Sequence, residues 1–188
     1  MRIRSLVLTL PLLLGACGYN KIQTMDERAK AAKQQISVQL QRRADLVPNL
    51  VATVKGYATH EAEVFETVAK ARAGLAGAVT SGNVTDMANA NQNLTGALGR
   101  LLASSEAYPQ LKADAQFLRL QDELTGTENR IAQARTDYNG AVQEYNAYIR
   151  AFPQVMTAKV TGAKPQEYFD VTTPGAKDVP TVDFGKKP

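Results

Sequence analysis

The chain holds few side chains that could carry out catalysis. Its one cysteine, Cys17, and one histidine, His60, cannot make a Cys/His zinc site. His60 lies in a charged segment typical of an exposed helix start. Carboxylates such as Glu61 and Glu63 are too close in sequence to share a helix face. No G-x-S-x-G motif or phosphate-binding glycine loop occurs. The sequence therefore predicts a protein that is not an enzyme, without catalytic residues, metal or cofactor; a hydrolase using carboxylates alone is the enzymatic alternative.

Cys17 is where covalent chemistry is expected. Residues 1–16 combine a basic start with an apolar run of about ten residues, which is typical of an export signal. The run is shorter than the ~20 apolar residues that span a bilayer. Leu14-Gly15-Ala16-Cys17 resembles the lipobox of bacterial lipoprotein precursors, whose cysteine becomes the acylated N-terminus. We predict a signal peptide over 1–16 and a covalent lipid, with chains such as palmitate, at Cys17; the alternative is a secreted protein with an idle thiol.

The residue after the cysteine bears on location. An aspartate at that position usually retains a lipoprotein in the inner membrane, so Gly18 favours the outer membrane, with the domain facing the periplasm. Loss of Arg2 and Arg4 with the signal lowers the formal net charge from +4 to +2. The charge therefore gives no reason to expect a nucleic-acid partner.

Apolar periodicity predicts four helices. The late part of the chain contains a heptad seam that predicts one long helix over 110–151, bounded by Pro109 and Pro153. The seam consists of Phe117, Leu124, Ile131, Tyr138, Tyr145 and Phe152, and of Leu120, Thr127, Ala134, Ala141 and Tyr148. Three earlier stripes predict helices over 24–57, after a cap at Thr59, and after a cap at Thr85, with a break at 81–83.

Four helices with short connections predict an all-α fold, an antiparallel four-helix bundle with long helices. We assign 17–23 to a lipidated N-terminus and linker, 24–159 to the bundle, and 160–188 to an extended tail rich in Pro and Gly. The tail either lies along the bundle as a strap or is partly disordered. Pro48 interrupts the first helix by removing the hydrogen bond to the Ala44 carbonyl. Either the helix kinks there, which we favour, or a new helix starts with Asp45 as its cap.

Polar residues among apolar ones are candidates for interaction. One group surrounds the proline: Arg42, Arg43, Asp45, Pro48 and Asn49. Arg72 lies on an apolar stripe and needs a carboxylate partner, either Glu128 or Asp45. Two Tyr-Asn pairs recur one heptad apart, Tyr138-Asn139 and Tyr145-Asn146. Specific packing within the bundle is the default interpretation of both pairs, and ligand binding is the alternative.

Several blocks together resemble the LemA family, over essentially the whole chain after residue 17. They include Tyr19-Asn20, the run from Gln39 to Val51, the run from Val54 to Glu61, Ala71-Arg72-Ala73, the run from Tyr108 to Ala113, Phe117, the run from Glu128 to Ile131, Ala134-Arg135, Tyr138-Asn139, Val142, Tyr145-Asn146, Phe152-Pro153 and Tyr168-Phe169. The resemblance implies an antiparallel helical bundle, one N-terminal membrane anchor and a domain facing away from the cytoplasm. It implies no reaction or catalytic residue. Many relatives keep a longer apolar segment as a transmembrane helix where this chain has the lipobox-like sequence.

These observations favour a membrane-anchored scaffold or adaptor of the bacterial cell envelope. Its partner would be a protein or a second copy of the chain. Because some LemA relatives are thought to work beside membrane zinc proteases, a membrane protease and a role in envelope protein quality control are implied candidates. The alternative from another class is a carrier that binds a peptide or apolar ligand between helices.

Overall fold

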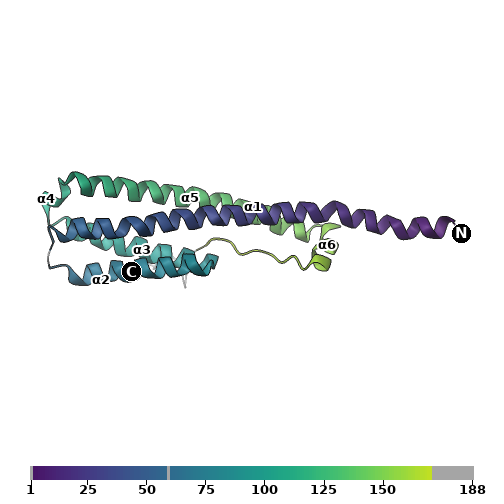
Figure 1. Cartoon of the computed structure of the whole chain (residues 1–188), viewed down its shortest axis with the longest axis horizontal. Coiled ribbons are helices and arrows are strands. Elements are labelled where there is room, and N and C mark those ends of the chain that lie inside the picture. The colour runs from purple at the N-terminus through teal and green to yellow at the C-terminus, as the bar shows by residue number, and fades with distance from the viewer. Residues whose placement is uncertain (1, 59, 171–188) are drawn as a thin grey trace, which may run out of the picture.

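The computed structural model describes residues 2–58 and 60–170, with side chains from residue 18 onward. The described chain is elongated, and it contains helices and no strand (Figure 1). The helices are α1 (Arg2–Lys55), α2 (Ala62–Ser81), α3 (Val84–Ser105), α4 (Pro109–Lys112), α5 (Ala115–Arg150) and α6 (Gln154–Thr161). The all-α prediction is confirmed, and the described part contains six helices where four were predicted.

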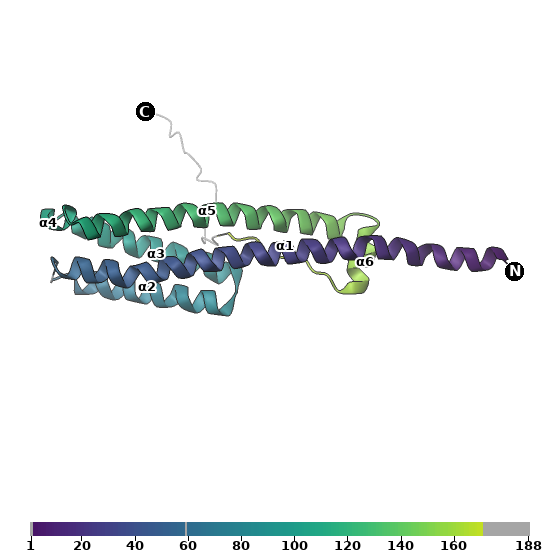
Figure 2. The ribbon, with the colours of Figure 1, turned by 45° about the horizontal axis from the view of Figure 1, so that its top comes forward.

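The two longest helices, α1 and α5, form the spine of the molecule and share its most extensive packing (Figure 1). They run in opposite directions, because Arg28 pairs with Glu144 at 2.7 Å while Tyr57 donates to Asp114 at 2.9 Å. Helices α2 and α3 pack on each other and along the half of α1 that is remote from the N-terminus (Figure 2). The N-terminal part of α1 extends beyond the rest of the rod (Figure 1).

The heptad seam is buried as expected from Phe117 to Tyr145, which places this side of α5 against α1. The prediction is wrong at the last position, because α5 ends at Arg150 and Phe152 is 84% exposed. The single helix expected over 110–151 is also divided. Asp114 accepts hydrogen bonds from the backbone N–H groups of Gln116 and Phe117, and this N-cap starts α5 afresh after the short α4.

The break between α2 and α3 lies where it was predicted, at 81–83. Gly82 ends α2 with a φ of 68°, a left-handed conformation that glycine adopts without strain. The cap of α3 is Asn83, which accepts from the N–H of Asp86 at 2.9 Å, so the prediction of a Thr85 cap is wrong. The expected cap at Thr59 lies outside the described residues, and α2 begins after Glu61 without a side-chain cap.

Helix α1 is continuous through two places where the sequence suggested otherwise. Residues 17–23, assigned to a linker, are helical. Contacts with distant segments explain this, because Ile22 is 1% exposed in a small cluster with Tyr145, Ile149 and Ala158. The helix also continues past Pro48, so the alternative of a new helix capped by Asp45 is wrong.

The end of the chain turns back along the rod. Helix α6, which the sequence analysis did not predict, extends into the first residues of the expected tail. Residues 163–170 then run without regular secondary structure toward the α2–α3 pair (Figure 1). Phe169 in this segment is 3% exposed and belongs to the main core. The strap alternative therefore holds for 163–170, which we name the strap; residues 171–188 lie outside the described part.

Candidate functional site

Arg72 supplies a hydrogen-bond donor where Pro48 removes one from α1. Proline has no N–H, so the carbonyl of Ala44 lacks its usual helical donor. Arg72 Nε, on α2, donates to that carbonyl at 2.9 Å. Neither Glu128 nor Asp45 forms an ion pair with Arg72 among the described residues, so the expectation of a carboxylate partner is wrong. The Ala44 carbonyl, which lacks a helical donor, is the partner of Arg72 in place of a carboxylate.

Glu128 instead lies near Arg43, whose side chain is 3% exposed. Arg43 Nη1 donates to Asn91 Oδ1 at 2.8 Å, and Nη2 is 3.6 Å from Glu128 Oε2. Its Nε is buried without an acceptor. Burial lowers the pKa of Arg43, and the charge of Glu128 opposes this shift. The arginine thus joins α1, α3 and α5, which indicates a role in packing the helices together.

The remaining candidates around the proline face solvent. Arg42, Asp45, Pro48 and Asn49 are exposed. Arg42, Asp45 and Asn49 are spaced by three and four residues and therefore share one face of α1. We call these three residues the α1 polar stripe. Gln41, which lies beside the stripe, donates from Nε2 to Asp45 Oδ1 at 2.9 Å.

The asparagines of the two Tyr-Asn pairs bind the strap rather than another helix. Asn146 Nδ2 donates to the carbonyl of Gln166 at 2.9 Å, and the N–H of Gln166 donates to Asn146 Oδ1 at 2.8 Å. Asn139 makes the same pair of bonds with Phe169, at 3.2 and 2.8 Å. Each amide satisfies both backbone groups of one residue, as a neighbouring strand would. We call the two asparagines the amide clamp.

The spacing of the clamp matches an extended peptide. Seven residues of helix advance about 10.5 Å, and three residues of extended chain advance about 10 Å. Asn139 and Asn146 are a heptad apart on α5, and Phe169 and Gln166 are three residues apart on the strap. The helical repeat and the extended repeat therefore stay in register over this distance.

Tyrosine and aspartate complete the strap site. The Tyr138 hydroxyl donates to the Glu167 carbonyl at 2.8 Å. Burial, with a smaller contribution from the Glu167 charge, raises the pKa of Tyr138 to about 12. Gln166 Nε2 donates to Asp26 Oδ1 at 2.6 Å, which ties the strap to α1. Neither Asp26 nor Gln166 was predicted from the sequence, because neither lies on an apolar stripe or in a recognisable motif.

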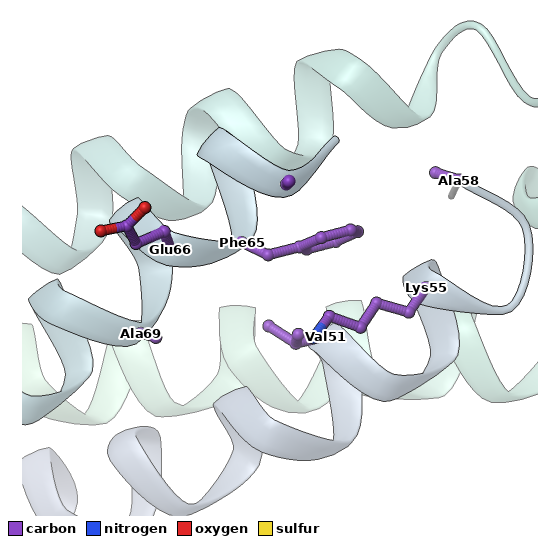
Figure 3. Close-up of a pocket in the computed structure, with 7 residues that line it drawn as sticks. Val51, Lys55, Ala58, Phe65, Glu66 and Ala69 are labelled. Atoms are coloured by element: carbon purple, nitrogen blue, oxygen red, sulfur yellow. The ribbon is translucent and has the colours of Figure 1, made fainter. Parts of the chain in front are cut away.

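An open groove of about 550 Å³ lies between the end of α1 and the start of α2 (Figure 3). Its lining residues are Val51, Lys55, Ala58, Ala62, Phe65, Glu66 and Ala69. Lys55 Nζ lies 5.2 Å from the centre of the Phe65 ring, a cation–π contact. The groove is mostly apolar, and the sequence analysis did not identify it.

In the described part of the chain, no group of three or more His, Cys, Asp or Glu side chains is arranged to hold a metal ion. Likewise, none of its helices has an apolar stretch of the length and hydropathy that crossing a membrane requires. Cys17 is part of α1, and its side chain lies outside the described part.

Fold and site together define an elongated all-helical protein that binds its own extended C-terminal segment through side-chain amides on α5. The LemA family model matches residues 32–184, and the chain belongs to the LemA family. It is 30% identical over 187 residues to "Magnetosome protein MamQ 2" and to "Magnetosome protein MamQ 1" of Paramagnetospirillum magneticum. "Magnetosome protein MamQ" of Magnetospirillum gryphiswaldense is equally similar. Each match covers 87% of this chain and 68% of the relative.

Proposed function

We propose that this protein is a membrane-anchored, non-enzymatic scaffold or adaptor of the bacterial cell envelope, an antiparallel four-helix bundle held by a lipid at Cys17. The continuity of α1 is the observation that carries the proposal. One helix extends from the anchor segment to the α1 polar stripe. At ~1.5 Å per residue the stripe begins about 40 Å from Cys17, so a partner would be held at a set height above the lipid surface.

Two findings support a membrane location. The part of α1 before Cys17 extends beyond the packed rod, so removal of residues 1–16 and acylation of Cys17 would leave the core intact (Figure 1). The relatives at 30% identity are named as magnetosome proteins, which is consistent with a membrane-associated function. We place the rod on the periplasmic side, at the outer membrane.

The anchor has a direct test. Cells that express the full chain are labelled with a fatty acid carrying an alkyne, and the purified protein is weighed intact. We expect an acylated polypeptide that begins at Cys17, and a Cys17→Ser chain without label. Unlabelled wild-type protein, or one that retains Met1, would contradict the anchor.

The scaffold role is tested at the α1 polar stripe. A photo-crosslinking amino acid is placed at Asn49 in intact cells, with Asn93 as the matched control because it is also an exposed asparagine on a helix. We expect a discrete crosslinked product from Asn49 and none from Asn93. A partner in envelope protein quality control, such as a membrane protease, or a second copy would be identified by mass spectrometry. Equal, diffuse labelling from both positions would contradict the role.

A peptide carrier is the second candidate, favoured by the amide clamp. The clamp contacts main-chain groups of the strap, and such contacts do not depend on the side chains of the bound segment. A chain that ends at Gly162 should then bind a fluorescent peptide with the sequence 163–170. Asn139→Ala and Asn146→Ala should each weaken this binding. A truncated chain without affinity for the peptide would remove this candidate.

A further inference from the structure

The most exposed apolar side chains gather at one end of the rod. Phe152 is 84% exposed, Met156 60% and Val160 88%, more than any other large apolar residue whose exposure the structure describes. Met156 and Val160 are four residues apart in α6 and share a face. Phe152 lies in the turn that leads into α6. We call these three residues the α6 apolar face. Exposure of this kind marks an interaction surface rather than a core.

The opposite side of α6 packs against the start of the rod. Ala158 is 4% exposed and lies in the small cluster with Ile22 and Tyr145. Gly18 lies so close to α6 that an added Cβ would be 3.6 Å from Thr157 Oγ1. Helix α6 therefore packs against α1 at Gly18, the residue next to Cys17, and Figure 2 shows the two helices side by side.

The segments beside the α6 apolar face carry basic charges alone, and the acidic residues that border them, such as Asp26 and Glu144, are bonded to Gln166 and Arg28. Residues 18–25 and 145–166 contain no Asp or Glu. They contain four basic residues, Lys21, Arg150, Lys159 and Lys164, all exposed and none in an ion pair among the described residues. Apolar side chains surrounded by basic ones are typical of elements that lie in the interface of an anionic membrane.

We propose that the α6 apolar face inserts into the lipid headgroup layer while the four basic residues contact anionic headgroups, so that the rod has a second, non-covalent contact with its membrane. This inference rests on the proposed anchor at Cys17. A face of three residues binds lipid weakly on its own. Once the neighbouring Cys17 holds it at the surface, its binding becomes intramolecular, at a high effective concentration. The two contacts together would restrain the angle of the rod to the membrane.

The chain has no tryptophan, so a single introduced one reports its own surroundings. The acylated full chain carrying Phe152→Trp is reconstituted in vesicles of phosphatidylethanolamine and phosphatidylglycerol with brominated acyl chains. The matched control is Leu118→Trp, since Leu118 is 47% exposed near the start of α5, at the other end of the rod. We expect a blue shift and bromine quenching for Phe152→Trp, and emission like that in water for Leu118→Trp.

Charge is tested in the same preparation. Adding Lys159→Glu to the Phe152→Trp chain should reduce the quenching in phosphatidylglycerol vesicles but not in phosphatidylcholine vesicles. Adding Arg100→Glu, on an exposed position of α3, should leave it unchanged. Equal effects of the two reversals would overturn the role of the basic residues.

Flotation of the vesicles separates failure of the anchor from failure of the lipid contact. Protein that floats while the Phe152→Trp emission is unquenched keeps the anchor and overturns the α6 contact. A blue shift that depends on protein concentration, without quenching, would instead assign the face to a second copy of the chain. Acylated protein that does not float would overturn the anchor, and the α6 contact with it.

Discussion

Replacing Arg72 should cost much more stability in the natural chain than in one that lacks Pro48. Arg72→Met keeps an unbranched apolar stem but removes the donor to the Ala44 carbonyl. Ala44 is 1% exposed, so this acceptor would stay buried without a partner. Losing a bond from a charged donor and leaving its acceptor unpaired costs about 1.5–3 kcal/mol. For a chain of this size that corresponds to a fall in Tm of roughly 3–12 °C.

Pro48→Ala supplies the missing donor. An alanine N–H at position 48 reaches the Ala44 carbonyl through the ordinary helical bond, so Arg72 is no longer needed there. In the Pro48→Ala background, Arg72→Met should cost less than about 1 kcal/mol, which corresponds to a coupling energy on the order of 1–2 kcal/mol.

The assay is urea unfolding of the four chains of this cycle, followed by circular dichroism at the helical band. Arg100→Met serves as a control for loss of an exposed arginine and should leave the midpoint almost unchanged. Equal losses of stability from Arg72→Met in both backgrounds would refute the coupling, because additivity within about 0.5 kcal/mol means that the two sites do not interact.

Three further perturbations probe the strap and the start of α5. Asn146→Ala removes two hydrogen bonds to Gln166, so at about 1 kcal/mol per bond the detached population of the strap should rise roughly 30-fold. This rise would appear as faster proteolysis of the strap, and an unchanged rate would contradict the clamp. The Asp114 pKa is lowered, chiefly by the hydrogen bond from the backbone N–H of Phe117. The stability that ionised Asp114 contributes to the folded chain is therefore present above the unfolded pKa near 4, and it is lost as pH falls through the lower folded pKa. Asp114→Asn should weaken this acid dependence in thermal melts, and an unchanged pH profile would count against it. The pKa of Tyr138 is raised to about 12, so the stability that its neutral hydroxyl contributes is present below pH ~10 and is lost between pH ~10 and 12. Tyr138→Phe should flatten this decline of stability in thermal melts. An equally steep decline would argue against burial of the hydroxyl.

The helical class and most of the core were predictable because they depend on local periodicity. The α5 seam is buried at every predicted position up to Tyr145, and the break at 81–83 is confirmed. The wrong predictions at Thr85, Asp114 and Phe152 concern helix ends. There a single cap or turn decides between neighbouring residues, and the apolar repeat carries no information about it.

The candidate site was predictable by residue type but not by partner. Arg72 was predicted to need a carboxylate partner, and the two Tyr-Asn pairs were predicted to provide specific packing within the bundle. The structure supplies the Ala44 carbonyl and the strap, which lie far from these residues in sequence.

By itself, then, the sequence determined the helical class, the apolar faces of the four main helices and the position of the lipobox-like cysteine, because each follows from the order of residues within a few turns. Tertiary structure alone decided that α1 continues through 17–23, that α6 folds back beside Gly18, and that Asn139 and Asn146 hold the strap. These outcomes depend on contacts between distant segments. Burial of Ile22 against α5 and α6 outweighs the weak local preference of a short segment for remaining a linker.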